Sequence, residues 1–311
     1  MNELKFRAMG SDAHVVVVGG PPNGAMQARA RIDELEQRWS RFIADSEISA
    51  LNRNAGQLVK VSDDTRLLVE RAIEAWRISG GSFDPTVLGS MIRAGYDRSF
   101  DTLGDAPSAG ISALLLGCTD IEVTERGVRL PAGTGFDPGG IGKGLAADLV
   151  ADETIAAGAD GVCVNLGGDL RVRGCAPEGN GWTVDIEHPS SSEPFARVGI
   201  REGAVATSTT LRRQWTVDGA PRHHLIDPAT GLPSDSDLTL ACVITAQAWA
   251  AEVLAKAVLL RGSSHPFDLL GGTGAQAVVI DSEGRIDATD GFAAYLGDAT
   301  LPPRLPTTER M

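Results

Sequence analysis

A glycine-rich segment is the clearest candidate for chemistry in this sequence. Residues 136–144 read Phe-Asp-Pro-Gly-Gly-Ile-Gly-Lys-Gly at the expected start of a helix. Free backbone N–H groups and the positive end of a helix dipole attract phosphate, and Lys143 adds a charge. The segment is not a Walker A loop, because Asp137 stands where that loop needs Gly and Gly144 stands where it needs Ser or Thr. It is not a Rossmann fingerprint either, because no buried strand precedes it. A phosphate cradle and a helix entry without a ligand are the two remaining interpretations.

Residues 80–87 form a second candidate, with the sequence Gly-Gly-Ser-Phe-Asp-Pro-Thr-Val. Phe83 can stack on a planar ligand, and Asp84 can bind the polar edges of such a ligand. The competing interpretation is an Asx-type turn beside a core phenylalanine, which is the more common one for such a segment alone. A third segment, residues 165–169, indicates only a strand end and a tight turn.

Two adjacent histidines, His223 and His224, begin the segment His-His-Leu-Ile-Asp-Pro-Ala-Thr-Gly. Side chains alternate along a strand, so only one of the two can enter a given site. A histidine in a strand is more often structural than catalytic. Because two of the five histidines of the chain stand here, a catalytic interpretation remains open.

Glu252 and Lys256 are four residues apart on an expected helix and therefore share one of its faces. Their neighbours on this helix are apolar. Because burying a charge without a partner is costly, such surroundings indicate a pair that lines a cavity rather than one on a solvated face.

The composition excludes several classes of function. The 311 residues include 28 Lys and Arg against 41 Asp and Glu, which gives a net charge of −13. So acidic a chain repels phosphate backbones and anionic lipids, and we expect neither nucleic acid nor a membrane as a partner. The four cysteines form no CxxC pair, and neither a signal segment nor a membrane-spanning apolar run is present. We therefore predict a cytoplasmic protein.

The order of the expected elements predicts an α+β fold rather than a doubly wound one, because short strands dominate the middle of the chain and helices flank them. We expect one domain over residues 1–300 and a disordered tail over 301–311. Ser62 is a predicted N-cap. Strands are expected at 13–18, repeatedly between 161 and 243, and at 276–281, and helices at 28–42, 62–78, 140–158, 247–261 and near 264–270.

Taken in order, these segments resemble the FAD:protein FMN transferase family, also called ApbE. The resemblance implies a two-lobed α+β fold with mainly antiparallel sheets flanked by helices and FAD in the cleft between the lobes. It implies an enzyme that cleaves the FAD pyrophosphate with Mg²⁺ and attaches FMN to a Ser or Thr hydroxyl of an acceptor protein, releasing AMP. The shared landmarks are residues 9–11, 39–52, 82–87, 137–144, 165–169, 204–208, 223–231 and 251–257.

The same resemblance assigns roles to individual residues. His224 matches the candidate general base that takes the proton from the acceptor hydroxyl. The Gly140 carbonyl, Glu252 and Lys256 fall at the magnesium-ligand positions. Phe42 stands where the family often has Tyr. The implied FAD contacts are Met9, Phe42, Ser82, Phe83, Asp84, Asp137 and Lys143.

The sequence departs from the family at the metal site. The family usually has Asp and Thr where this chain has Glu252 and Lys256, and a charged lysine has no lone pair for a cation. We therefore predict that magnesium binding is weakened, or that the ammonium of Lys256 replaces the ion. In the alternative, Lys256 turns away to pair with Glu252 or solvent, and Mg²⁺ binds through the remaining ligands.

Two other functions remain open at this stage. One is an FAD pyrophosphatase that releases FMN and AMP to water, and the other is a non-catalytic FAD-binding protein with an altered metal site. A minor feature is residues 271–275, Gly-Gly-Thr-Gly-Ala, which partly resemble the family's acceptor sequence but lack its leading Asp and trailing Ser or Thr. We interpret them as a glycine turn and expect no self-flavinylation at Thr273.

Overall fold

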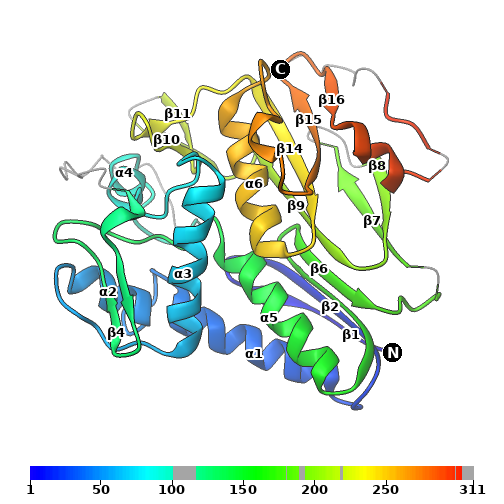
Figure 1. Ribbon diagram of the computed structural model, residues 1–311, viewed down its shortest axis with the longest axis horizontal. Helices are drawn as coiled ribbons and strands as arrows, with labels where there is room; N and C mark the ends of the chain where they lie inside the picture. The colour runs from blue at the N-terminus through cyan, green and yellow to red at the C-terminus, as the bar shows by residue number, and fades with distance from the viewer. Residues whose placement is uncertain (101–116, 180, 189–192, 218–219, 298, 303–311) are drawn as a thin grey trace.

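The chain folds around one large sheet (Figure 1). All strand pairs within this sheet are antiparallel, and the predicted α+β class with mainly antiparallel strands is confirmed. In spatial order the strands are β1 (Asn2–Ala8), β2 (Ser11–Gly19), β5 (Ala159–Leu166), β6 (Asp169–Gly174), β9 (Gly203–Thr209), β14 (Leu238–Thr245), β15 (Gln276–Asp281) and β16 (Ile286–Ala288).

The computed structural model describes residues 1–100, 117–179, 181–188, 193–217, 220–297 and 299–302. The predicted tail at 301–311 lies mostly outside the described residues.

The remaining strands form two-stranded hairpins and the helices pack around the sheet. The hairpins pair β3 (Glu122–Thr124) with β4 (Gly127–Arg129), β7 (Trp182–Glu187) with β8 (Pro194–Ile200), β10 (Gln214–Val217) with β11 (Ala220–His223), and β12 (Ile226–Asp227) with β13 (Leu232–Pro233). The α-helices are α1 (Gly24–Trp39), α2 (Glu47–Arg53), α3 (Asp63–Ile78), α4 (Leu88–Arg93), α5 (Gly142–Ala156) and α6 (Ala248–Arg261), with 3₁₀ turns η2 (Cys118–Asp120), η3 (Asp268–Leu270) and η4 (Asp290–Tyr295). Within these described ranges, no helix has the length and apolar character needed to cross a membrane.

The sheet separates two hydrophobic cores because alternate strand residues point to opposite faces. Val15 and Val164 pack on the face covered by α1, α5 and α6. Val172 and Cys242 pack on the other face, which the β7–β8 hairpin covers in part (Figure 1). The large sheet thus packs against helices on one face and against the β7–β8 hairpin on part of the other.

Most predicted elements are present, with shifted ends. The Ser62 hydroxyl accepts from the Thr65 N–H as the predicted N-cap of α3. Helix α1 begins at Gly24 and ends at Trp39, earlier than predicted at both ends. The prediction missed β1, although its alternation of charged and partly buried residues is typical of a half-buried strand, and it missed the short helix α2. The helix predicted near 264–270 is only the turn η3.

One glycine determines how the first turns of α5 and α6 meet. A β-carbon on Gly144 would overlap the carbonyl oxygen of Ala248, so only glycine allows this approach. The Asp148 carboxylate accepts the N–H groups of Ala248 and Trp249, each at 2.9 Å, and so caps α6 from α5. This contact brings the side chains of Lys143 and Glu252 together.

Candidate active site

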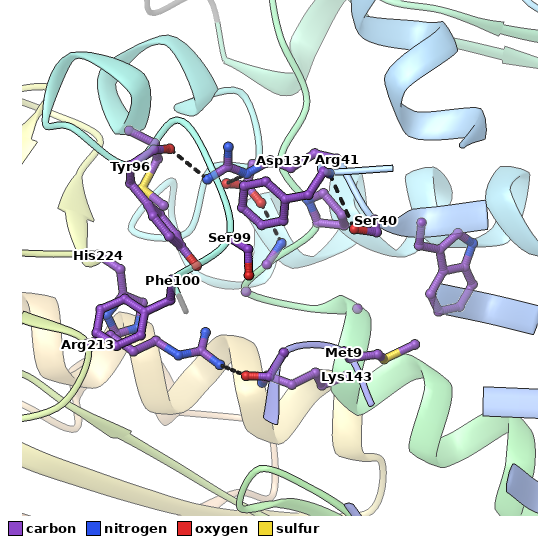
Figure 2. Close-up of a pocket in the computed structure, with 18 of the residues that line it drawn as sticks. Met9, Ser40, Arg41, Tyr96, Ser99, Phe100, Asp137, Lys143, Arg213 and His224 are labelled. Atoms are coloured by element: carbon purple, nitrogen blue, oxygen red, sulfur yellow. Dashed lines mark hydrogen bonds and ion pairs between the residues drawn. The ribbon is translucent and has the colours of Figure 1, made fainter. Parts of the chain in front are cut away.

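A cavity of about 460 Å³ opens at the end of the large sheet. Its walls come from the β1–β2 turn, the end of α1, the residues flanking α4 and the first turn of α5 (Figure 2). Of the residues predicted for the site, only Glu252 does not line this cavity, and it lines an adjoining one instead. The structure therefore brings together Met9, Phe42, Ser82, Phe83, Asp84, Asp137, Gly140, Lys143, His224 and Lys256.

Lys143 is held between two carboxylates. Its Nζ donates to Asp169 and, at 2.7 Å, to Glu252 Oε1. Burial alone would lower the pKa of Lys143, but the charges of Asp169 and Glu252 outweigh burial and raise it, so this lysine is charged. Burial raises the pKa of Asp169 against the opposing effect of Lys143.

Glu252 pairs with α5 rather than with its own helix. Its Oε2 accepts the N–H of Gly144 at 2.8 Å, while Oε1 is bound to Lys143. Lys256 does not pair with Glu252 in this structure, because α5 supplies both partners of the carboxylate. Lys256 points elsewhere.

Lys256 lies against the glycine-rich turn. A β-carbon on Gly140 would overlap Lys256 Nζ, which also lies 5.7 Å from the centre of the Phe83 ring. Among the described residues, no hydrogen bond or salt bridge engages this Nζ. Burial lowers the pKa of Lys256, and the charge of Glu252 opposes that shift. The cavity thus contains a lysine amino group that no described residue contacts through a hydrogen bond or a salt bridge.

His224 also lacks a partner. Its Nδ1 is buried and makes no hydrogen bond within the described part of the chain. Burial, followed by the charges of Lys256 and Arg213, lowers the pKa of His224 well below its usual value, so the imidazole is neutral and able to accept a proton. His223 instead binds the Ser234 carbonyl at 3.0 Å, which confirms that only one of the two histidines enters the site.

Arg41 and Asp137 form one wall of the cavity. Arg41 Nε lies 3.1 Å from Asp137 Oδ2, and both side chains are less than a tenth exposed. The guanidinium also donates to the Tyr96 carbonyl at 2.9 Å and lies 4.1 Å from the centre of the Phe42 ring (Figure 2). Asp137 therefore acts on any ligand as part of an ion pair.

Both interpretations of residues 80–87, the Asx-type turn and the ligand contact, agree with the structure. Asp84 Oδ1 accepts the N–H of Thr86 at 2.8 Å, which is the Asx-type turn, and Phe83 is only 3% exposed. Both side chains nevertheless line the cavity. Burial raises the pKa of Asp84, with the hydrogen bonds from Thr86 opposing it.

The predicted phosphate cradle at residues 139–144 has fewer free N–H groups than expected. The N–H of Gly139 donates to Asp137 Oδ1 at 2.7 Å, and that of Gly142 donates to the Pro138 carbonyl at 2.8 Å. Within residues 139–144, only the N–H groups of Gly140 and Lys143 have no acceptor among the described residues. The prediction of a run of free N–H groups is therefore correct only in part.

The lining residues that were not predicted from the sequence include Arg41, Tyr96 and Arg213. Arg213 has a left-handed backbone, with φ of 51°, and its Nη2 donates to the Gly10 carbonyl at 3.3 Å. Such a conformation is uncommon for arginine and often occurs at functional sites. The sequence signal for Arg213 was a pair of adjacent arginines, Arg212 and Arg213, in an acidic chain. Tyr96 stands in a stretch without a clear helix or strand pattern.

The three positions implied for magnesium do not fit a divalent cation here. Both oxygens of Glu252 are engaged by donors, and the ammonium of Lys256 fills the space beside Gly140. A second charged lysine, Lys143, adds to the repulsion. Across the ranges that the structure describes, no group of three or more His, Cys, Asp or Glu side chains is placed to hold a metal ion.

The fold and the site define a flavin-transferase-like class of protein, and comparison with known proteins agrees. Residues 9–279 match the model of the ApbE family, and the chain belongs to that family. It is 31% identical to the FAD:protein FMN transferase of Treponema pallidum over 270 residues, covering 80% of this chain and 74% of the relative. The transferase of Vibrio cholerae is 26% identical, over 87% of this chain and 81% of the relative.

Solved structures share the fold. The ApbE protein of Thermotoga maritima superposes with a TM-score of 0.85 at 23% identity, covering 95% of this chain and 99% of that one. The apo flavinyl transferase ApbE of Pseudomonas stutzeri gives 0.81 at 23% identity, over 96% and 98%.

Proposed function

We propose that this chain is an FAD:protein FMN transferase. The observation that carries the proposal is His224, a neutral imidazole that lines the cavity beside Lys143 and Lys256. The names of the relatives support the same activity. A protein that only binds FAD has no need of a base at this position.

FAD is the substrate, and the cavity suggests how it binds. Phe42 and Phe83 offer rings to a planar group, and Asp84 offers an acceptor to its polar edge. Met9, Ser82 and the Arg41–Asp137 pair complete the wall. The pyrophosphate then lies toward Lys143, Lys256 and Arg213, where the N–H groups of Gly140 and Lys143 also point away from internal acceptors.

The transfer step follows from this arrangement. His224 takes the proton of an acceptor Ser or Thr hydroxyl as the hydroxyl oxygen bonds to the phosphorus of the FMN half. The bond between that phosphorus and the bridging oxygen breaks, and AMP leaves with the bridging oxygen. The products are AMP and a phosphoester of FMN on the acceptor, with the proton on His224.

We further propose that Lys256 supplies the positive charge that magnesium supplies elsewhere in the family. The cluster of Lys143, Lys256 and Arg213 faces the carboxylates of Asp169 and Glu252. Lys143 is neutralised by those two contacts, whereas Lys256 is not neutralised by direct contact with a described residue. Its ammonium can stabilise the charge that develops on the pyrophosphate oxygens.

The experiment that tests the function is incubation of the protein with FAD and candidate acceptor proteins, followed by denaturing electrophoresis and detection of flavin fluorescence. Fluorescence that stays with an acceptor band, together with AMP release, supports the transferase. AMP and free FMN without a labelled band indicate a pyrophosphatase, and FAD binding without cleavage indicates a binding protein. Either of the last two results contradicts the proposal.

A further inference from the structure

A second cavity adjoins the first and has a different set of walls. It measures about 1230 Å³ and shares Lys143, His224 and Lys256 with the first cavity. Of the residues implied to contact FAD, only Lys143 lines it. The base therefore lies between a cavity that suits FAD and a larger one that has no assigned occupant.

The larger cavity includes an unpaired sheet edge. Strand β6 pairs with β9 only over Gly203–Val205, because the β5–β6 turn at Gly167 and Gly168 ends the neighbouring hairpin there. Beyond Val205, β9 pairs with β14 on one side and with no described strand on the other. Three residues of this segment, Thr207, Ser208 and Thr209, line the cavity.

The hydrogen-bond pattern shows which residues of β9 offer their backbone to the cavity. The N–H of Thr210, the residue after β9, donates to the carbonyl of Thr239 in β14 at 3.3 Å. Antiparallel strands alternate the direction of their backbone groups from one residue to the next. Thr210 and Ser208 therefore point toward β14, whereas Thr207 and Thr209 point their N–H and carbonyl groups toward the open edge.

We infer that the acceptor protein binds here as an extended segment that adds a strand to β9 beside Thr207 and Thr209. This inference rests on the proposed function. Strand addition places backbone hydrogen bonds on the open edge and leaves the side chains of the segment free to reach outward. One Ser or Thr of the added strand then reaches His224, which lies at the boundary of the two cavities.

The charges around the groove indicate how the acceptor is recognised. Arg7 lies 3.2 Å from Asp12, and Arg212 forms a salt bridge with Glu187, so these charges are matched within the protein. These two ion pairs are already formed within the protein, so we assign recognition of the segment to backbone pairing along β9.

Proline substitution tests the open edge. Thr207→Pro removes an N–H that no described group of the free protein accepts, so the fold has no bond to lose there. The matched control is Glu3→Pro on β1, at the far edge of the same sheet. The Gly167 N–H donates to the Asp12 carbonyl, so Asp12 and, by alternation, Val16 direct their backbone groups toward β5. Glu3 lies opposite Val16 in the β1–β2 pair and therefore directs its own N–H away from β2, toward the open edge of β1.

The probe is a synthetic peptide containing Asp-Gly-Gly-Thr-Gly-Ala-Ser, which restores the ends that residues 271–275 lack. Thr207→Pro is expected to raise KM for this peptide about tenfold with a smaller change in kcat, whereas Glu3→Pro should match the wild type. In a second series, peptides with one N-methyl group each are offered to the wild-type protein. N-methylation should impair transfer at alternate positions only.

The outcomes separate the two proposals. A Thr207→Pro variant that remains folded and keeps the wild-type KM contradicts the strand-addition site. N-methyl groups that act equally at neighbouring positions contradict it too, and this series decides the matter if Thr207→Pro unfolds. A wild-type protein that releases no AMP from FAD contradicts the proposed function itself.

Discussion

Two buried ion clusters lie along the α5–α6 contact, and they differ in how completely the fold satisfies them. In the first, Arg171 Nε lies 3.2 Å from Asp148 Oδ1, and Asp148 also caps α6. The Arg171 guanidinium donates to the Val172 and Gly203 carbonyls, each at 2.9 Å. Each of the two side chains is thus used by the fold, and the cluster connects α5, β6, β9 and α6.

The second cluster has unused groups. Lys143, Asp169 and Glu252 satisfy one another, yet Lys256 Nζ and His224 Nδ1 have no partner among the described residues. A buried polar atom such as His224 Nδ1 is rarely left unpaired, because an unpaired buried group costs free energy, and Lys256 Nζ faces the cavity. The difference indicates that the first cluster serves stability and the second serves chemistry.

The largest expected effect comes from removing the unpaired base. His224→Ala should lower kcat for FMN transfer by about 10²–10⁴-fold while FAD remains bound, because a general base contributes mainly to the chemical step. His223→Ala is the matched control, since that side chain binds the Ser234 carbonyl outside the cavity. Kinetics with a labelled acceptor and FAD titration measure the two effects. Loss of FAD binding in His224→Ala would instead make it a binding residue.

The free energy of unfolding should depend on the first cluster and not on the second. Asp148→Ala leaves Arg171 with only its 3.4 Å contact to the Glu202 carboxylate and uncaps α6, and we expect a loss of about 3–5 kcal/mol in the free energy of unfolding. Lys256→Met removes a charge that has no partner and should leave stability unchanged or raise it. Chemical denaturation of both variants checks this. A strong destabilisation by Lys256→Met would show that Lys256 serves the fold.

Asp84 should affect affinity rather than rate. Its carboxylate completes the Asx-type turn and faces the cavity, so Asp84→Ala should weaken FAD binding about tenfold or more, which is about 1.4 kcal/mol. Asp45→Ala, at an exposed carboxylate away from the cavity, is the control. Fluorescence titration with FAD distinguishes them. Equal affinities in the two variants would remove Asp84 from the site.

The smallest effect expected is on pH dependence. Burial lowers the pKa of His224 well below 6.5, so the neutral base persists as the pH falls through that value. The rate of transfer should therefore decline only at pH values clearly below 6.5, where His224 gains its proton. A pH profile of kcat measures this limb. A half-maximal rate at pH 6.5 or above would mean that the base is not the buried histidine described here.

Much of the fold and most of the site were predictable from the sequence. Capping at Ser62 and strand alternation depend on local chemistry, and ordered motifs located all but one of the predicted residues in one cavity. The partner of Glu252 was not predictable, because it depends on how closely Gly144 lets α5 approach α6. Arg213 was missed for a related reason, since its left-handed backbone is a tertiary outcome with no local pattern.

The metal requirement tests the account most directly. FMN transfer by the wild-type protein and by Lys256→Thr is measured by intact mass of the acceptor, in EDTA and then with added Mg²⁺. If the ammonium beside Gly140 replaces the ion, the wild type transfers FMN in EDTA and Lys256→Thr does so only with Mg²⁺. A wild-type protein that is inactive in EDTA and recovers with Mg²⁺ would contradict the account, because Lys256 would then leave room for the metal it is proposed to replace.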